Sequence, residues 1–421
     1  MRILFYFLLL LPPVLYAQEK NTLNLSEAYE LALKNYPLVK QRALVKQTSG
    51  INIDILGSGF LPQFSISGQA TYQSDVTSIN VPIPGFSFNP PSKDQYKILA
   101  DINQLIYDGG NIREQKNMLH LNEAAEQQKL EVELYTLKDR INQLFLGVLF
   151  LDGQLKQADL IKNDLNTGIK KIEAQISNGV AFRSNLNVLK AEMLKADQHT
   201  IELKAAMKGL TDVLGLFIDR NVTDSVLLKM PEVPVLNYTA NIQRPEIKYY
   251  STQESLLNGQ FKLIDSRNRP KAGLFIQGGY GKPGLNFLKN DFTFFYTAGI
   301  RFNWLFGGLY TMKKEKELIT QNKKGVGIRK ETFLLNTNTA LKQQEAEINK
   351  LEQLIARDNE IIDLRMKVKE AANAQLENGV ITANDYLREV NAEDQSKQTL
   401  ISHRIQLLQA RVNYLAISGK Q

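Results

Sequence analysis

The stretch FTFFYTAGIRFNWLF, which runs from Phe292 to Phe306, has the strongest alternation of apolar residues in this chain. Side chains of a β-strand point alternately to its two faces, so a period of two residues marks a strand whose faces differ. Every second residue here is apolar, and most of these residues are aromatic: Phe292, Phe294, Tyr296, Ala298, Ile300, Phe302, Trp304 and Phe306. The stretch therefore predicts a β-strand with a strongly aromatic face.

Three further segments alternate in the same way, although less strongly. They are FLPQFSISGQATYQ (60–73), DQYKILADINQLIYDGGNI (94–112) and RPKAGLFIQGGYGK (269–282). The sequence thus predicts four strands. A water-soluble sandwich is the alternative for such patterns, but it needs more strands than this chain offers.

Two very long helices are predicted after the strand pairs. No proline lies between Asp108 and Asn178, and apolar residues recur there at alternating spacings of four and three. That period of 3.5 is typical of left-handed coiled-coil packing. A helix over residues 109–177 would be on the order of 100 Å long at 1.5 Å per residue. Its counterpart over residues 308–376 has a weaker seam, which three polar residues interrupt: Gln344, Asp358 and Arg365.

The second half of the chain repeats the first. SNGVAFRSNLNVLKAE (177–192) resembles ENGVITANDYLREVNAE (377–393), and the strand segments correspond in the same order. Each half reads as two strands, a very long helix, a loop at Asn-Gly-Val and a shorter helix. We therefore expect a first repeat over residues 18–230 and a second over residues 231–421, linked by the proline-bearing segment KMPEVPVLNY.

The first residues, MRILFYFLLLLPPVLYAQ, indicate a secretory signal peptide over residues 1–17. One arginine precedes an apolar run, and small Ala17 suits the cleavage site. A membrane anchor is the alternative, but the run is short for a spanning helix and Pro12 and Pro13 interrupt it. We therefore expect an exported protein.

Cysteine is absent from the sequence, which excludes disulfides, thiolate metal sites and cysteine nucleophiles. The formal net charge of +7 is spread along the chain and is not gathered into a basic tail. Charge alone would permit nucleic acid binding, but in an exported protein it favours a solvated basic surface. We therefore expect no nucleic acid partner.

Four strands leave two open edges, and an exposed edge invites aggregation. Closing the sheet removes the edges, but about eight strands are needed for a barrel. We therefore expect several copies of the chain to pool their strands in a membrane barrel. Its lipid-facing aromatic residues would be Phe292, Phe294, Tyr296, Phe302 and Trp304.

Four segments together carry a resemblance to a known family. They are LNLSEAYELALKNYPLVKQ (23–41), the strand-to-helix junction QLIYDGGNI (104–112) and the two NGV segments. In this order they resemble the TolC-like outer membrane efflux proteins, over essentially all of the chain after residue 17. No single motif is specific, but the ordered set is.

The resemblance implies a mainly α-helical fold with membrane β-structure. A long α-helical coiled-coil barrel would extend through the periplasm, and each chain would give four strands to the twelve-stranded transmembrane β-barrel of a homotrimer. The loops at 74–94 and 282–290 would be extracellular.

The resemblance also implies a function, that of the outer-membrane exit duct of a tripartite efflux or type I secretion system. Such a duct is a passive channel with a periplasmic gate. The implied partners are outer membrane lipid, a periplasmic adaptor (membrane fusion) protein and an inner-membrane pump of the RND or ABC type.

In this family the periplasmic mouth closes near the segment after the second NGV, where members often carry aspartates. Asp385 falls on the first such position, Arg388 stands where some members have a second aspartate, and Asn185 matches Asp385 in the first half. A ring of three Asp385 carboxylates would raise their pKa values and favour bound cations. Arg388 could instead pair with Asp385 or lie on the surface. The plain structural alternative for Asp385 is a first-turn acid stabilised by the helix dipole.

The two Asn-Gly pairs have a structural role by default. Asn-Gly tolerates positive φ and so turns the chain between helices. We expect turns at Asn178, Gly179, Asn378 and Gly379, and these tips are candidates for contact with an adaptor.

No enzyme chemistry is predicted, since the sequence offers no nucleophile–base–acid set and no Walker A motif. Residues 279–284 contain a GxGxxG pattern, but Pro283 and another strand follow where a dinucleotide site needs a helix. The histidines, His120, His199 and His403, lack metal-ligand spacing, and we expect each on a solvated helix face. We therefore expect no cofactor and no metal.

Two other functions stay open. One is a periplasmic coiled-coil adaptor or scaffold of an efflux assembly, and the other is a soluble coiled-coil enzyme or scaffold. An adaptor would nest one hairpin between β-domains, whereas this chain shows the long helix twice, which favours the duct.

Overall fold

A computed structural model describes residues 22–77, 90–222, 226–232, 236, 238 and 241–420. The expected signal peptide, residues 1–17, and most of the expected 74–94 loop lie outside these ranges. The chain divides into two units. The sheet unit comprises Lys40–Val132 and Pro245–Leu334, and the hairpin unit comprises Met1–Val39, Glu133–Arg244 and Leu335–Gln421.

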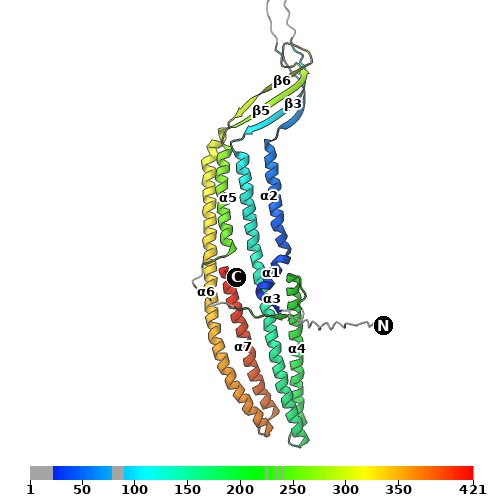
Figure 1. Ribbon diagram of the computed structural model, residues 1–421, viewed down its shortest axis with the longest axis vertical. Coiled ribbons are helices and arrows are strands. Elements are labelled where there is room, and N and C mark those ends of the chain that lie inside the picture. Colours follow the sequence, from blue (N-terminus) through cyan, green and yellow to red (C-terminus); the bar gives the residue numbers. More distant parts are fainter. Residues whose placement is uncertain are drawn as a thin grey trace, which may run out of the picture. The chain divides into compact units, whose positions relative to one another are not determined.

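The sheet unit contains a four-stranded antiparallel sheet in the order β2-β3-β5-β6 (Figure 1). Its strands are β2 (Gln63–Tyr72), β3 (Asp94–Tyr107), β5 (Lys271–Lys282) and β6 (Thr293–Asn303). All four predicted strands are therefore present, and the prediction of a strand pair in each half of the chain is correct.

The strand register aligns the alternating residues of all four strands. Phe64 lies beside Ile102, Ile102 beside Ile276, and Ile276 beside Ala298. Every second row across the sheet is apolar in this way, whereas the rows between them are largely polar. Residues of the apolar face are strongly exposed: Phe64, Ile66, Ile98, Ile276, Phe294, Tyr296, Ile300 and Phe302.

Along the sequence, each pair of strands is preceded by one helical segment and followed by another. These segments are α2 (Gln41–Gly57), the first part of α3 (Asn111–Ser177), α5 (Pro245–Arg267) and the first part of α6 (Gly307–Glu377). The short helix η2 (Ser58–Phe60) leads from α2 into β2.

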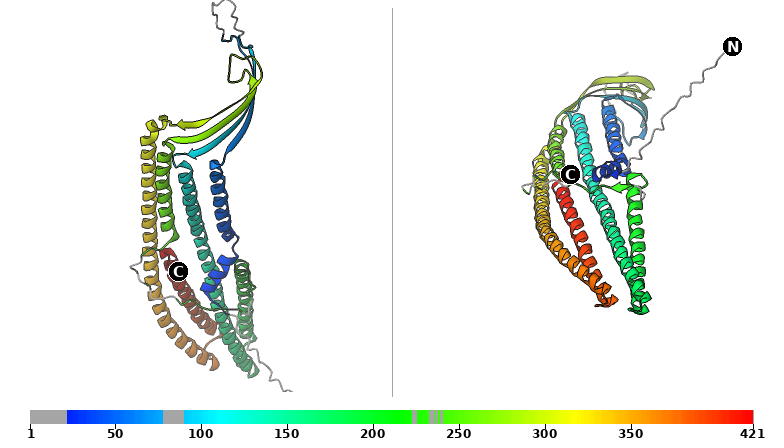
Figure 2. Two further views of the ribbon diagram at one scale, coloured as in Figure 1. Left: turned by 45° about the horizontal axis from the view of Figure 1, so that its top comes forward. Right: turned by 60° about the horizontal axis from the view of Figure 1, so that its bottom comes forward.

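The helices of the sheet unit are held in pairs. Arg42 of α2 donates two hydrogen bonds to Glu131 of α3, at 2.7 and 2.8 Å. Lys323 of α6 donates to Asn258 of α5 at 2.9 Å, and α5 lies beside α6 in each view (Figure 1, Figure 2).

The junction from β3 to α3 is capped by a buried aspartate. The Oδ1 of Asp108 accepts from the Gly110 amide at 2.8 Å, and its Oδ2 accepts from the Ile112 amide at 2.5 Å. Two amides that no helical carbonyl can reach are thereby satisfied. The long helix accordingly begins at Asn111.

The hairpin unit contains the second parts of α3 and α6, together with α4 (Arg183–Ile218) and α7 (Ala383–Ser418). Each long helix turns back into a shorter one, α3 into α4 and α6 into α7 (Figure 2). Each half of the chain thus runs helix, strand, strand, long helix, shorter helix, from α2 to α4 and from α5 to α7.

The predicted apolar seam of α3 forms part of the core of the hairpin unit. Near the turns, α3 contributes Leu165 and Ile172, α4 contributes Leu189, and α6 and α7 contribute residues that include Leu376 and Val390. All of these side chains are buried. Lys162, which fills an apolar slot of the seam, is held by ion pairs to two aspartates: Asp159 and Asp197.

The first helix of the described residues, α1 (Leu25–Asn35), belongs to the hairpin unit. Asn24 caps this helix, since its Oδ1 accepts from the Glu27 amide at 2.7 Å. The preceding strand β1 (Thr22–Leu23) pairs in parallel with β4 (Leu227–Leu228). After α1, the 3₁₀ helix η1 (Pro37–Lys40) leads into α2.

Within the part of the chain that the structure describes, no helix is both long enough and apolar enough to cross a membrane.

Candidate functional site

The two Asn-Gly turns form matching exposed tips at the ends of the hairpins. Gly179 and Gly379 adopt left-handed conformations, with φ of +75° and +69°. At the first tip, the Val180 amide donates to the Gln175 carbonyl at 2.9 Å and the Gly179 amide to the Ile176 carbonyl at 3.0 Å. Equivalent bonds close the second tip. Both turns are thus Schellman motifs, which end a helix on a glycine because only glycine accepts this φ without strain.

The residues after each glycine differ between the tips. Val180 and Val380 are both strongly exposed, at 72% and 70%. In the first tip Phe182 is also exposed, at 78%, and makes no side-chain hydrogen bond as the N-cap of α4. In the second tip the N-cap of α7 is Thr382, which does make such a bond. The first tip is therefore the more apolar of the two.

Asp385 lies in the first turn of α7 and forms a capping box with Thr382. The Thr382 hydroxyl donates to Asp385 Oδ2 at 2.7 Å, and the Thr382 amide donates to the same oxygen at 3.2 Å. In return, Thr382 Oγ1 accepts from the Asp385 amide at 3.2 Å. The hydroxyl bond and then the amide bond hold the pKa of Asp385 below its ordinary value, and the charge of Arg388 adds a smaller effect. In this single chain Asp385 is thus an ionised helix cap.

The other two predicted gate residues do not contact Asp385. Arg388 is exposed, and its Nε lies 3.4 Å from Oε1 of the neighbouring Glu389. Asn185 is half-buried in the first turn of α4, where its amide donates to the Phe182 carbonyl at 3.0 Å. The structure therefore supports the capping role of Asp385, whereas a gate formed by Asp385, Arg388 and Asn185 stays a prediction.

A buried ion cluster lies two turns further along α7 and was not predicted from the sequence. Glu393 is nearly inaccessible, and Nζ of Lys369 from α6 lies 2.6 Å from its Oε2. Lys397 Nζ lies 2.6 Å from its Oε1. Lys369 also contacts Asp164 of α3 at 3.0 Å. The cluster thus ties α3, α6 and α7 together behind the tips.

Burial and ion pairing shift the pKa values of this cluster in opposite directions. Burial alone would raise the pKa of Glu393, but the contacts with Lys369 and Lys397 outweigh it, so the pKa lies below the ordinary value. Burial alone would lower the pKa of Lys369, but its contacts with Glu393 and Asp164 raise it above the ordinary value. Both groups are therefore charged at neutral pH.

Three of the five predicted lipid-facing aromatic residues lie on β6. Phe294, Tyr296 and Phe302 share its exposed apolar face. Phe292 precedes the strand, and its ring lies over Tyr280 with a centroid separation of 5.6 Å. Trp304 follows the strand.

Trp304 leaves the alternating pattern because β6 ends at Asn303 and α6 begins at Gly307. Its Nε1 donates to the Asn268 carbonyl at 3.1 Å, and its ring lies 4.7 Å from that of Phe306. The predicted strand over residues 292–306 is thus too long at its carboxyl end, since the junction with the helix takes over there.

One part of the chain matches a known family. Residues 28–210 match the family model described as outer membrane efflux protein. This part of the chain carries an outer membrane efflux protein domain. This confirms the predicted resemblance, and the family is one of channel proteins. A comparison with curated proteins found no match.

The fold of the chain recurs in solved outer membrane channels. CusC matches with a TM-score of 0.67 at 14% identity, over 94% of this chain and 92% of its own. CmeC of Campylobacter jejuni matches with 0.63 at 15%, over 94% and 86%. The open-state MtrE channel of Neisseria gonorrhoeae matches with 0.65 at 12%, over 94% and 89%. At these identities the likeness establishes the fold, and it confirms the predicted fold class.

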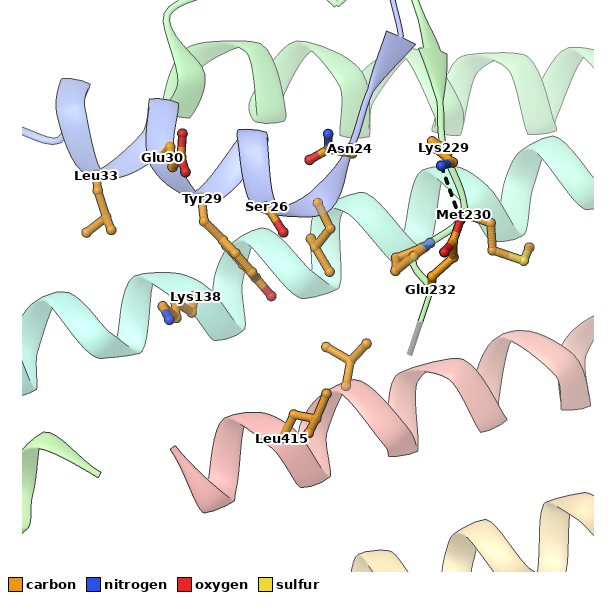
Figure 3. A pocket seen from close by; sticks show the side chains of 13 residues that line it. Asn24, Ser26, Tyr29, Glu30, Leu33, Lys138, Lys229, Met230, Glu232 and Leu415 are labelled. Carbon is orange, nitrogen blue, oxygen red and sulfur yellow. Dashed lines mark ion pairs between the residues drawn. The ribbon is translucent and has the colours of Figure 1, made fainter. Parts of the chain in front are cut away.

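One pocket lies within the hairpin unit. It has a volume of about 590 Å³ and lies between α1, α3, α7 and residues 229–232 (Figure 3). Lys138 enters it with Nζ 5.6 Å from the ring centre of Tyr29, and burial lowers the pKa of Lys138. Lys229 and Glu232 form an ion pair at its rim, at 3.2 Å. The pocket therefore marks where α1, α7 and residues 229–232 meet.

Cation-binding side chains are not gathered anywhere in the described ranges, where no group of three or more His, Cys, Asp or Glu residues could hold a metal ion. His120 and His199 are exposed, as expected. His403 is not, because its ring is half-buried and its Nδ1 lies 2.6 Å from Oδ2 of buried Asp358. This pair explains why Asp358 interrupts the apolar seam of α6.

Proposed function

We propose that the chain is the outer-membrane exit duct of a tripartite efflux or type I secretion system. Three copies would pool their four strands into a twelve-stranded barrel in the outer membrane, and their helices would continue as a conduit into the periplasm. The division into repeats over residues 18–230 and 231–421 belongs to this proposal. The matching element orders of the two halves support it.

The single observation that carries the proposal is the four-stranded sheet with one exposed apolar face and two unpaired edges. Within the described residues, neither the outer edge of β2 nor that of β6 is hydrogen-bonded to another strand. Phe294 is 85% exposed and Ile66 is 82% exposed. In water, such an apolar face and such unpaired edges would promote aggregation. In a membrane, lipid would cover the apolar face, and strands of neighbouring copies would hydrogen-bond to the edges.

The hairpin tips are the proposed contacts with a periplasmic adaptor. Val180, Phe182 and Val380 present apolar side chains around the turns at Asn178–Gly179 and Asn378–Gly379. Because the duct itself carries no nucleotide-binding motif, an inner-membrane pump of the RND or ABC type would supply the energy. The exposed apolar tips support a protein partner there.

The periplasmic gate is the proposed role of the segment around Asp385. Three symmetry-related carboxylates would bind divalent cations and so block current. Asp385→Ala should weaken block by divalent cations in planar-bilayer conductance. Thr382→Ala is the matched control, since it removes the cap and keeps the carboxylate. Equal cation block in wild type and Asp385→Ala would leave Asp385 with its capping role alone.

The test of the whole proposal uses the full chain purified from membranes. We expect extraction only with detergent, a trimer by sedimentation, and ion-conducting channels after reconstitution. A coiled-coil adaptor or scaffold would instead be recovered from the soluble periplasmic fraction and would give no conductance. Recovery as a soluble monomer contradicts the duct.

A further inference from the structure

The polar face of the sheet carries a small hollow at the edge where β2 and β5 begin and where β3 and β6 end. Its volume is about 270 Å³. Five residues of the polar face line it, two with cationic side chains and three with amide side chains: Lys271, Arg301, Gln63, Asn103 and Asn303. All of these residues lie within the sheet unit.

The strand register places these residues together. Lys271 lies beside Asn303, and Gly273 lies beside Arg301 in the next row of the same face. Gly273 has no side chain, and the backbone of β3 comes so close to it that an added Cβ would lie 2.9 Å from the Gln104 carbonyl oxygen. The hollow therefore has a cation on each of two neighbouring rows.

Arg301 is held in place by an aromatic ring. Its guanidinium carbon lies 4.7 Å from the ring centre of Phe275. That ring covers Gly299 of β6, where an added Cβ would lie 3.1 Å from the ring. A guanidinium that stacks on an aromatic face keeps its in-plane N–H donors available for a planar carboxylate. Arg301 is thus preorganised to bind an anion through two parallel hydrogen bonds.

The charges of this face are unbalanced. The four strands place three cations on it, Lys97, Lys271 and Arg301, and one carboxylate, Asp101. Asp101 accepts a hydrogen bond from Gln277 at 2.6 Å. Among the described residues, neither Lys271 nor Arg301 forms an ion pair. The hollow is therefore a site of positive potential that internal carboxylates do not neutralise.

We propose that this hollow binds the anionic groups of solutes, carboxylates in particular, and makes the channel favour anions. The inference rests on the proposed function, in which the polar face lines a water-filled conduit. In a trimer the site would occur once per chain and would surround the path with Arg301 and Lys271 of each copy.

The test measures ion selectivity of the full chain in planar bilayers under a gradient of KCl. In the variant Lys271→Gln/Arg301→Gln, the permeability ratio of potassium to chloride should rise about twofold or more. Coulomb's law in water gives about this effect for one unit charge roughly 10 Å from the ion. Lys282→Gln is the matched control, because Lys282 lies on the opposite face of the same strand. Its ratio should equal that of the wild type.

A second measurement uses citrate as a carboxylate probe. Citrate at millimolar concentration should reduce the current of the wild type and of Lys282→Gln, and should leave the current of the double variant unchanged. Arg301→Lys keeps the charge but loses the planar fork, so it should weaken citrate block while its permeability ratio stays near that of the wild type. This variant also decides the matter if the double variant does not insert.

The outcomes separate the two proposals. If the wild type forms channels and the variants have the same ion selectivity and the same citrate block as the wild type, the anion site is overturned and the duct proposal stands. A wild-type protein that forms no channels would overturn the duct, and the anion site with it.

Discussion

Nζ of Lys369 lies 2.6 Å from Oε2 of Glu393, a side chain that is only 3% exposed. The contact joins α6 to α7 inside the hairpin unit, and Lys369 reaches Asp164 of α3 as well. Two buried charges of opposite sign are stable together, whereas either one alone would face a large desolvation cost. The pair therefore makes the association of three helices depend on electrostatics as well as on apolar packing.

Removal of the buried carboxylate should destabilise the hairpin unit. Glu393→Gln keeps the shape of the side chain but leaves Lys369 and Lys397 without their shared partner. We expect the free energy of unfolding to fall by about 3 kcal/mol, the lower end for a broken buried pair, because Lys369 keeps Asp164. Urea unfolding followed by circular dichroism measures it. Glu360→Gln is the control, since Glu360 and Arg357 form an exposed pair, and its effect should be below about 0.5 kcal/mol.

The same pair predicts a dependence on pH. The pKa of Glu393 is lowered in the folded state, so its contribution is fully present above the ordinary glutamate value of 4.5 and is lost as the pH falls through the folded pKa. The pKa of Lys369 is raised, so its contribution is present below the ordinary value of 10.5 and is lost as the pH rises through the folded pKa. The stability difference between wild type and Glu393→Gln should be constant from about pH 6 to 8 and shrink below about pH 4. A difference that grows in acid contradicts the assignment.

The glycines of the tips should respond to alanine in the opposite sense to a helical glycine. Gly179→Ala and Gly379→Ala place a Cβ at positive φ, although the space around them is open. We expect each to lower stability by about 1 kcal/mol. Gly327→Ala in α6, where the space is also open, should raise stability by up to about 1 kcal/mol. If all three variants change the free energy of unfolding in the same direction, φ is not the deciding factor.

Loss of the capping box should loosen the start of α7. Thr382→Ala removes the hydroxyl that binds both the amide and the carboxylate of Asp385, at a cost of about 1 kcal/mol. Hydrogen exchange should then accelerate at the Asp385 amide. Ser184→Ala in the first turn of α4 is the control, and protection there should stay the same. Unchanged exchange at Asp385 in Thr382→Ala contradicts the capping role.

Neighbouring glycines of β5 offer a sharp test of the sheet's packing. A Cβ at Gly279 would lie 2.5 Å from the Phe295 ring and 2.8 Å from Leu99, whereas a Cβ at Gly278 meets nothing within 4 Å. Gly279→Ala should lower stability by about 1–3 kcal/mol through overpacking. Gly278→Ala, on the opposite face, should be tolerated. Thermal unfolding of the two purified variants distinguishes them.

Much of the fold could be predicted because its signals are local. The alternation at Phe294–Phe302 and the heptads of α3 depend only on where successive side chains point along a strand or a helix. The Asn-Gly turns were predicted for the same reason, since positive φ is a property of one residue. The ends of elements were less predictable, as Trp304 shows, because its hydrogen bond to Asn268 comes from a distant segment.

The candidate site was predicted only in part. The family resemblance points to Asp385 after the second NGV turn, but the sequence leaves its capping and gating roles open. Glu393, Lys369 and Asp164 were missed, since charged residues on helices are usually solvated and nothing in their spacing marks them as partners. Asp358 interrupts the apolar seam of α6, and only the structure shows that His403 lies beside it.

By itself the sequence determined the periodicities, and with them the aromatic strand face, the long helices, the duplicated order and the turns. These follow from bond geometry within a few residues. Only the tertiary structure decided which charges are buried together and which polar residues share a hollow, such as Lys271 and Arg301. Such neighbours are brought together by strand register and helix packing, which depend on contacts between residues far apart in the chain.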